Sequence, residues 1–197
     1  MNNLNIIFID IINTSLNYLL ESPFLSDSDI SFLNKFKVEG VKKEKTCSLI
    51  LKNKYVGEYR VDENGKPVSD HFYFNISHSD GAVVFIKDDY PIGIDIEKIR
   101  PVEDGLIDFI SSKEERDYIK APSDFFEIWT NKESLSKAIG TGIKEVIKEI
   151  PGLPIDGKKE YKGKTFHSKT IKYKEFIVSV NREKDEQFEI NVKEEQL

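Results

Sequence analysis

The chain has 197 residues, and its 29 Lys and Arg against 35 Asp and Glu give a formal net charge of −6. A hydrophobic fraction of 39%, with 13 Phe and 8 Tyr, is enough for a packed core and excludes a wholly disordered chain. One Cys and three His exclude a disulfide scaffold and a zinc site rich in Cys or His.

The same composition limits location, partners and size. No apolar run approaches the roughly 18 residues that a membrane span needs. The first 20 residues contain Asp10 and neither Lys nor Arg, so we expect no signal peptide and a cytoplasmic protein. The acidic total argues against nucleic acid as a partner. The length fits one large domain or two small ones.

In chain order, the first half of the sequence predicts one buried strand, two helices and two further strands. Continuous apolar runs indicate the strands, and apolar residues at helical spacing indicate the helices. The predicted elements are a strand at Asn5 to Ile12, helices at Ser28 to Lys37 and Lys42 to Tyr55, a turn at Gly65-Lys66-Pro67, and strands at Phe72 to Ile76 and Ala82 to Ile86.

The second half predicts a strand, two helices closed by a glycine, and three strands that alternate like an antiparallel sheet. These elements are a strand at Pro91 to Glu97, helices at Lys113 to Lys120 and Asp124 to Ile139 with Gly140 after the second, and strands at Thr165 to Ser168, Phe176 to Val180 and Phe188 to Val192. This order predicts an α+β fold, and two halves joined near Asp88 to Pro91 are one arrangement it allows. No sequence repeat relates the halves.

The strand Ile92 to Glu97 alternates strictly between apolar and other residues. Its three isoleucines fall on one face, while Gly93, Asp95 and Glu97 fall on the other. The two carboxylates are then roughly 7 Å apart and repel each other unless a cation or proton lies between them. Hard oxygen ligands suit Mg²⁺. The alternative is an ordinary half-buried strand with a polar outer face.

The helix Asp124 to Ile139 brings three further side chains into one row. Trp129, Glu133 and Lys137 are spaced at i, i+4 and i+8, and Lys132 lies beside them. Trp129 can anchor the row to the core, so that Glu133 and Lys137 project from a fixed platform. The alternative is a surface Glu-Lys pair with no role in chemistry.

A histidine follows the predicted strand at Phe72 to Ile76. His78 is flanked by Ser77 and Ser79, and a histidine at a strand end can donate to a phosphate. The alternative is a turn histidine satisfied by nearby backbone. A serine hydrolase is not indicated, because no Gly-x-Ser-x-Gly segment occurs, and the glycine-rich phosphate loops are also absent.

Taken together and in this order, Asn-Ile-Ser-His-Ser, Ile-Gly-Ile-Asp-Ile-Glu and Phe-Phe-x-x-Trp-x-x-Lys-Glu-Ser-x-x-Lys resemble the signature of 4′-phosphopantetheinyl transferases of the surfactin-synthetase-activating (Sfp-like) type. The three motifs span Phe74 to Lys137. The resemblance implies a pseudo-dimer of two similar α/β halves, each an antiparallel sheet packed with helices, over residues 1–88 and 89–197. It implies a monomer that binds coenzyme A in the cleft between them.

The resemblance also implies an activity, the Mg²⁺-dependent transfer of phosphopantetheine from coenzyme A to a serine of an acyl or peptidyl carrier protein, with 3′,5′-ADP released. Such carriers serve fatty acid, polyketide or nonribosomal peptide synthesis. Carried over residue by residue, the implied roles are Mg²⁺ binding by Asp95, Glu97 and Glu133, coenzyme A phosphate contact by His78 beside Ser77, pyrophosphate contact by Lys132 and Lys137, nucleotide contact by Lys66, and 3′-phosphate contact by Ser48 and Lys35. Cys47 stands where the family often has Arg.

The chemistry leaves three points open. The base that takes the serine proton can be Glu133, directly or through a metal-bound water, and Glu115 is a weaker candidate. An acidic carrier can dock on the basic stretches Lys35 to Lys54 and Lys158 to Lys174, or these lysines can serve solubility alone. The alternative functions are a non-catalytic module that binds coenzyme A or a carrier, and a Mg²⁺-dependent pyrophosphate hydrolase.

Overall fold

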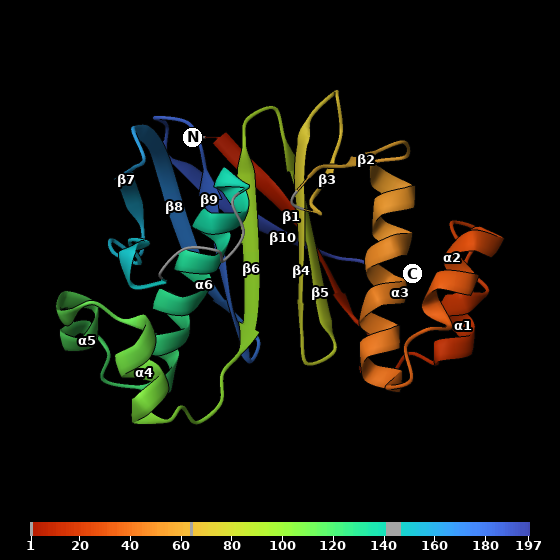
Figure 1. The fold of residues 1–197 in the computed structure, drawn as a ribbon, viewed down its shortest axis with the longest axis horizontal. Helices are drawn as coiled ribbons and strands as arrows, with labels where there is room; N and C mark the ends of the chain where they lie inside the picture. Colours follow the sequence, from red (N-terminus) through yellow and green to blue (C-terminus); the bar gives the residue numbers. More distant parts are fainter. Residues whose placement is uncertain (1, 64, 141–146) are drawn as a thin grey trace.

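The structure is a computed structural model that describes residues 2–63, 65–140 and 147–197. It has an α+β fold in four layers, with helices on the outside of two sheets that pack face to face (Figure 1). Among the described helices, none combines the length and the apolar character needed to span a bilayer.

The first sheet has the strand order β10-β1-β5-β4. β5 pairs antiparallel with both β1 and β4, and Asp80 and Gly81, both with positive φ, form the tight turn between β4 and β5. β10 comes from the other end of the chain and pairs in parallel with β1. The strands are β1 (Asn2–Asp10), β4 (Tyr73–Ser79), β5 (Ala82–Asp88) and β10 (Phe188–Glu194).

The helix α3 covers the outer face of this sheet, and α1 and α2 pack on α3 (Figure 1). α3 packs Ile50 and Leu51 against Val83 and Phe85 of β5, which explains why the helix is apolar on one side only. A two-stranded hairpin follows α3 and carries Lys66 between its strands. These elements are α1 (Leu16–Leu20), α2 (Asp27–Leu33), α3 (Glu39–Tyr55), β2 (Arg60–Val61) and β3 (Pro67–Val68).

The second sheet is antiparallel with the order β6-β9-β8-β7, and α6 packs along β6 and β9 on its outer face. α6 begins with Pro122 in its first turn and ends at Gly140, which has a positive φ. The elements are β6 (Ile92–Lys98), α4 (Asp104–Ile110), α5 (Lys113–Tyr118), α6 (Pro122–Ile139), the 3-10 turn Ile147–Glu149, β7 (Gly157–Tyr161), β8 (Lys164–Tyr173) and β9 (Phe176–Arg182).

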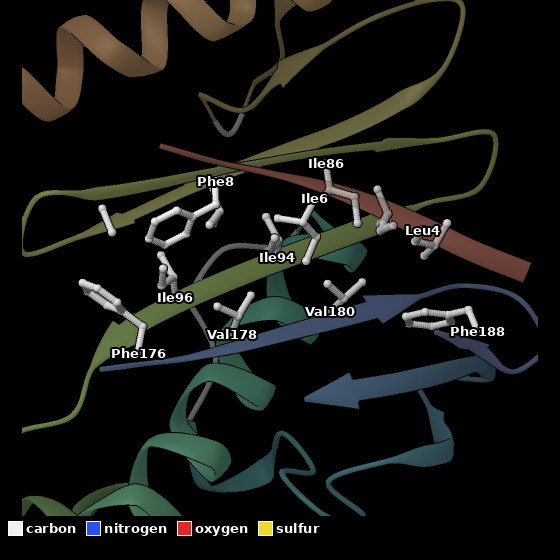
Figure 2. Packing of buried hydrophobic residues seen from close by; sticks show 13 residues of the cluster. Leu4, Ile6, Phe8, Ile86, Ile94, Ile96, Phe176, Val178, Val180 and Phe188 are labelled. Carbon is white, nitrogen blue, oxygen red and sulfur yellow. The ribbon is translucent and has the colours of Figure 1, made fainter. Parts of the chain in front are cut away.

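A hydrophobic core fills the space between the two sheets (Figure 2). Ile94 and Ile96 of β6 lie opposite side chains of the first sheet such as Ile6 and Phe8. The predicted isoleucine face of this strand is therefore confirmed, and its polar face must point away from the core, toward α6.

The structure departs from the predictions in three places. β4 extends to Ser79, so His78 lies within a strand and not after it. The first sheet is not purely antiparallel, because β10 joins it in parallel, and sheet membership therefore does not follow the division between residues 88 and 89. The predictions also omit α1, α4, β2, β3 and β7. Local periodicity cannot reveal a partner strand from the far end of the chain.

The basic stretch Lys158 to Lys174 is largely paired with carboxylates in the fold. Four lysines of the stretch Lys158 to Lys174 each lie within 4.0 Å of a carboxylate from the acidic segment that follows or from the preceding loop. The pairs are Lys158 with Asp185, Lys164 with Glu183, Lys169 with Asp156 and Lys174 with Glu194. This stretch is therefore less suited to dock an acidic partner than its composition suggests.

Cys47 is the only cysteine of the chain, and it lies on α3 with its side chain completely buried. Burial raises the pKa of its thiol, so the reactive thiolate is suppressed. We expect the native protein to resist iodoacetamide at about pH 8 and to gain one carbamidomethyl group when unfolded in urea. Mass spectrometry of the intact chain checks this, and rapid labelling of the folded protein would contradict the packing of α3.

Candidate active site

β4 and β6 lie side by side where the two sheets meet (Figure 1). Alternation along β4 directs Ser77 and Ser79 toward β6. The Ser77 hydroxyl donates to Asp95 Oδ1 at 2.7 Å, and the Ser79 hydroxyl donates to Glu97 Oε2 at 3.0 Å. The two predicted carboxylates are therefore each hydrogen-bonded by a serine of the neighbouring strand.

Gly93 brings α6 against β6 at close range. A Cβ atom at this position would lie 2.0 Å from the Ser134 carbonyl oxygen and 2.5 Å from the Ala138 nitrogen. Both atoms belong to the α6 backbone, so only glycine permits this approach. The contact places Glu133 and Lys137, on the same helix, beside Asp95.

Lys137 forms an ion pair with Asp95. Its ammonium donates to Asp95 Oδ1 at 2.6 Å, to Ser77 Oγ at 2.9 Å and to the Ile94 carbonyl at 3.2 Å. Asp95 is only 5% exposed, whereas the Lys137 side chain is 28% exposed. The lysine therefore bridges a buried carboxylate and the molecular surface.

Glu133 is the most perturbed carboxyl group of this cluster. Burial, with the nearby charges of Asp95 and Glu97, raises the pKa of Glu133 to about 7, and Lys137 offsets this only in part. Glu133 Oε1 and Asp95 Oδ2 are both buried, and neither has a hydrogen-bond partner among the described residues. Since buried oxygens of this kind are costly to leave unpaired, the pair is suited to share a cation.

The donor set of this cluster fits a Mg²⁺ ion in its chemistry. Carboxylate oxygens are the preferred protein ligands of Mg²⁺, and the unpaired oxygens of Asp95 and Glu133 are of this type. Within the described residues, however, no three His, Cys, Asp or Glu side chains already converge as a metal site. Lys137 holds Asp95 Oδ1, and Glu97 Oε2 accepts from Arg100 at 3.0 Å. A cation in this cluster would therefore share Asp95 with Lys137 and Glu97 with Arg100.

His78 points to the opposite side of β4, as alternation from Ser77 requires. Its Nδ1 lies 3.1 Å from Glu44 Oε2 and its Nε2 lies 3.3 Å from Lys45 Nζ, both on α3. Burial acts to raise the pKa of Glu44, but hydrogen bonds from His78 and the Gly81 N–H outweigh it and lower the pKa. His78 therefore belongs to a second polar group beside α3 and does not contact the carboxylates of β6.

Lys132 is not part of the cluster, which departs from the prediction that it faces a pyrophosphate. Its ammonium is fully buried, 2.8 Å from Glu115 Oε2, and it donates to the Ile147 carbonyl. One residue along a helix turns a side chain by about 100°, so Lys132 points away from the row that carries Glu133. Glu115 also accepts from two backbone N–H groups and is 3% exposed, which does not suit a base.

The remaining predicted residues lie at different distances from the cluster. Lys66 donates to the Lys137 carbonyl at 2.6 Å and so lies at the C-terminal end of α6. Ser48 bonds to the Glu44 carbonyl within α3, and Lys35 is exposed with its ammonium 5.7 Å from the centre of the Phe32 ring. The structure brings neither Ser48 nor Lys35 to Asp95.

Two residues that the sequence interpretation omitted, Glu44 and Arg100, contact predicted site residues. Glu44 pairs with His78, and Arg100 pairs with Glu97. The signal for Arg100 is its spacing, three residues after Glu97. Glu44 carried no signal beyond its place in a predicted helix, because its partner is 34 residues away.

The family model and the similar proteins found by comparison all point to one family. A sequence model described as the 4′-phosphopantetheinyl transferase superfamily matches residues 91–189. Similar proteins include the 4′-phosphopantetheinyl transferases psf-1 of Bacillus pumilus, 39% identical over 94 residues (43% of this chain, 40% of that protein), and gsp of Aneurinibacillus migulanus, 40% identical over 92 residues (43% and 39%). The 4′-phosphopantetheinyl transferase Sfp of Bacillus subtilis strain 168 is 36% identical over 94 residues (43% and 42%). The aligned region thus spans about 40% of the length of these relatives.

Proposed function

Because the chain belongs to the 4′-phosphopantetheinyl transferase superfamily, as its three motifs predicted, we propose that it transfers phosphopantetheine from coenzyme A to a carrier protein. The acceptor is a serine hydroxyl of an acyl or peptidyl carrier protein, and the leaving group is 3′,5′-ADP. One observation carries this proposal. Asp95, Glu133 and Lys137 meet at the junction of the two sheets, with two buried carboxylate oxygens that no residue in the described part of the chain pairs.

We further propose that the fold is a pseudo-dimer of two similar halves. In support, each half is built on a four-stranded sheet with one long helix on its outer face, α3 or α6. The edge strands β4 and β6 meet at the junction, which is where the Asp95 cluster lies. β10 completes the first sheet although it comes from the end of the second half.

Asp95 and Glu133 are the proposed Mg²⁺ ligands, and Glu97, on the same strand as Asp95, is the proposed third ligand. When bound, the ion neutralises charge on the pyrophosphate of coenzyme A. The rest of the chemistry falls to the protein side chains. Lys137, freed from Asp95, is close enough to face the charge that develops on the phosphate oxygens.

In the proposed reaction the serine oxygen of the carrier attacks the β-phosphorus, and the bond between that phosphorus and the bridging oxygen of 3′,5′-ADP breaks. Glu133 is the proposed base for the serine proton, because its buried carboxyl group lies beside Asp95 and Lys137, where the pyrophosphate is proposed to bind. Glu115 is not proposed, since its oxygens are already held by Lys132 and by two backbone N–H groups.

The remaining contacts to coenzyme A are proposed from charge and position. Lys66 lies at the end of α6 next to Lys137, and His78 lies with Lys45 beside α3, so both can meet phosphate groups. The carrier is proposed to approach the basic stretch Lys35 to Lys54, because the stretch Lys158 to Lys174 is largely paired with carboxylates.

The proposed function is tested by incubating the protein with coenzyme A, Mg²⁺ and several apo carrier proteins and weighing each carrier. We expect a gain equal to one phosphopantetheine group on at least one carrier. No gain on any carrier would overturn the transferase. Cleavage of coenzyme A without a carrier would indicate a pyrophosphate hydrolase, and tight binding with neither reaction would indicate a binding module.

We expect Lys137→Met to lower the rate of transfer by roughly 10²-fold, because a positive charge facing the reacting phosphates is lost. The size of the side chain is kept, so packing of α6 on β6 should be preserved. The matched control is Lys120→Met, which removes an exposed lysine just before α6. The measurement is the initial rate of transfer by both variants, and an equal loss of rate in both would refute a specific role for Lys137.

A further inference from the structure

A ring of buried polar contacts lies on the side of α6 away from Asp95 and joins Lys159, Asn131, Lys132, Glu115 and Gly152. Lys159 of β7 is 3% exposed, and its ammonium donates to Asn131 Oδ1, to the Gly152 carbonyl at 2.9 Å and to the Pro151 carbonyl at 3.3 Å. Among the described residues this ammonium has three neutral oxygen acceptors and no carboxylate within 4.0 Å, which is an uncommon arrangement because burying a charge is costly. The mechanism proposed above does not use it.

The ring continues through Gly152 and returns to α6. The Gly152 N–H donates to Glu115 Oε1 at 2.7 Å, and Glu115 Oε2 lies 2.8 Å from the ammonium of Lys132. A Cβ atom on Gly152 would lie 2.8 Å from Glu115 Oε1, so the ring needs glycine at this point. Lys159 therefore links Asn131 to the backbone of Gly152, and Glu115 links Lys132 to the same residue.

Asn131 also fastens this turn of α6 to the sheet. Its amide donates to the Ile155 carbonyl at 2.9 Å and to Thr170 Oγ1 at 3.1 Å. Its Oδ1 accepts from Asn181 at 3.1 Å as well as from Lys159. Every polar atom of the amide is thus engaged, and such fully satisfied networks allow one relative placement where apolar packing allows several.

We propose that Lys159 is a positioning residue, which holds the Asn131–Lys132 turn of α6 so that the next residue, Glu133, faces Asp95. This inference rests on the proposed function. It follows from the ring of contacts and from the adjacency of Asn131, Lys132 and Glu133 in the chain. A misplacement of about 1 Å at a reacting group can cost roughly 10²-fold in rate.

The charge of Lys159 supports a role beyond packing. Burial lowers its pKa to about 7, with Glu115 opposing that effect and Lys132 adding to it. A methionine of similar volume would avoid this cost, and it leaves no charge unpaired because the three acceptors of Lys159 are neutral. Lys159→Met should therefore fold, while removing the donor that ties Asn131 to Gly152.

The test compares Lys159→Met with Lys158→Met, the neighbouring residue of the same strand, whose side chain is 48% exposed. We expect Lys159→Met to lower kcat by roughly 10²-fold and to leave KM for coenzyme A within about threefold, whereas Lys158→Met keeps the wild-type kcat. An unchanged kcat in folded Lys159→Met would overturn the proposal. So would a KM increase that accounts for the whole loss.

A spectroscopic readout separates this inference from the proposed function. Trp129 is the only tryptophan of the chain, lies on α6 and stacks on Phe125, so its fluorescence reports the placement of the helix. We expect a shifted emission maximum in Lys159→Met and none in Lys158→Met. If the wild type transfers nothing, the proposed function fails and fluorescence alone decides whether Lys159 positions α6.

A second variant covers the case in which Lys159→Met does not fold. Glu115→Gln keeps an acceptor for the Gly152 N–H but breaks the ion pair with Lys132. We expect a fall in kcat with a shift of Trp129 emission, as for Lys159→Met. A fall in kcat with unchanged emission would make Glu115 act on the chemistry itself, and would overturn the ring as a positioning device.

Discussion

Glu133→Gln is expected to abolish phosphopantetheine transfer while making the protein more stable at about pH 8. The amide can neither take a proton nor contribute charge to a cation site, so a rate loss of at least roughly 10²-fold is expected. The stability gain has a separate origin. It comes from the buried carboxyl group, whose pKa is about 7 in the folded protein against an ordinary 4.5.

The direction of the pH effect follows from these two values. Below pH 4.5 the group carries a proton in both the folded and the unfolded chain. Between 4.5 and about 7 the unfolded chain loses its proton while the folded one keeps it, so the free energy of unfolding falls as the pH rises. Above pH 7 the loss is complete and amounts to about 3 kcal/mol for this group.

Urea unfolding of wild type and Glu133→Gln at about pH 4 and pH 8 measures this effect. The difference in the free energy of unfolding between the two proteins should grow by about 3 kcal/mol over that range, in favour of the variant. Glu127→Gln is the matched control, because Glu127 lies on the same helix and bonds to Tyr118 outside the cluster. Full transfer activity in Glu133→Gln, or an equal pH slope in both proteins, would contradict the role of Glu133 in the Asp95 cluster.

Gly93→Ala is expected to lower the free energy of unfolding by at least about 3 kcal/mol, a large effect for one added methyl group. The new Cβ atom would lie 2.0 Å from the Ser134 carbonyl oxygen and 2.5 Å from the Ala138 nitrogen. Backbone atoms cannot rotate away as a side-chain end can, so α6 must shift as a whole. Any protein that still folds should lose transfer, because Glu133 and Lys137 move with the helix.

Gly40→Ala provides the matched control for this prediction. Gly40 lies in the first turn of α3 and lacks a positive φ, and no described atom lies within 4 Å of an added Cβ. Alanine there should leave stability unchanged or raise it by up to about 1 kcal/mol. Thermal unfolding followed by circular dichroism distinguishes the two substitutions. If both variants melt together with the wild type, α6 does not approach β6 as closely as the contact at Gly93 requires.

Local sequence patterns predicted the parts of the site that lie on single elements. Period-two alternation placed the isoleucines of β6 in the core and Asp95 and Glu97 together on the other face, and the structure has this arrangement. Helical spacing likewise placed Glu133 and Lys137 in one row of α6. These predictions succeed because side-chain direction within one element depends on neighbours only a few residues away.

Other features depended on contacts between distant parts of the chain. The periodicity of α6 predicted the order of its residues around the helix, but it could not show which side of the helix meets β6. The contact between Lys132 and Glu115 was therefore not predictable from it. Local patterns likewise could not show that β10 completes the first sheet, that His78 faces Glu44, or that Lys164 pairs with Glu183. The spacing of residues along the chain was enough to identify the three motifs and the chemistry that they indicate. Tertiary packing alone decided which of these side chains meet, because each such contact joins elements whose relative placement no local pattern encodes.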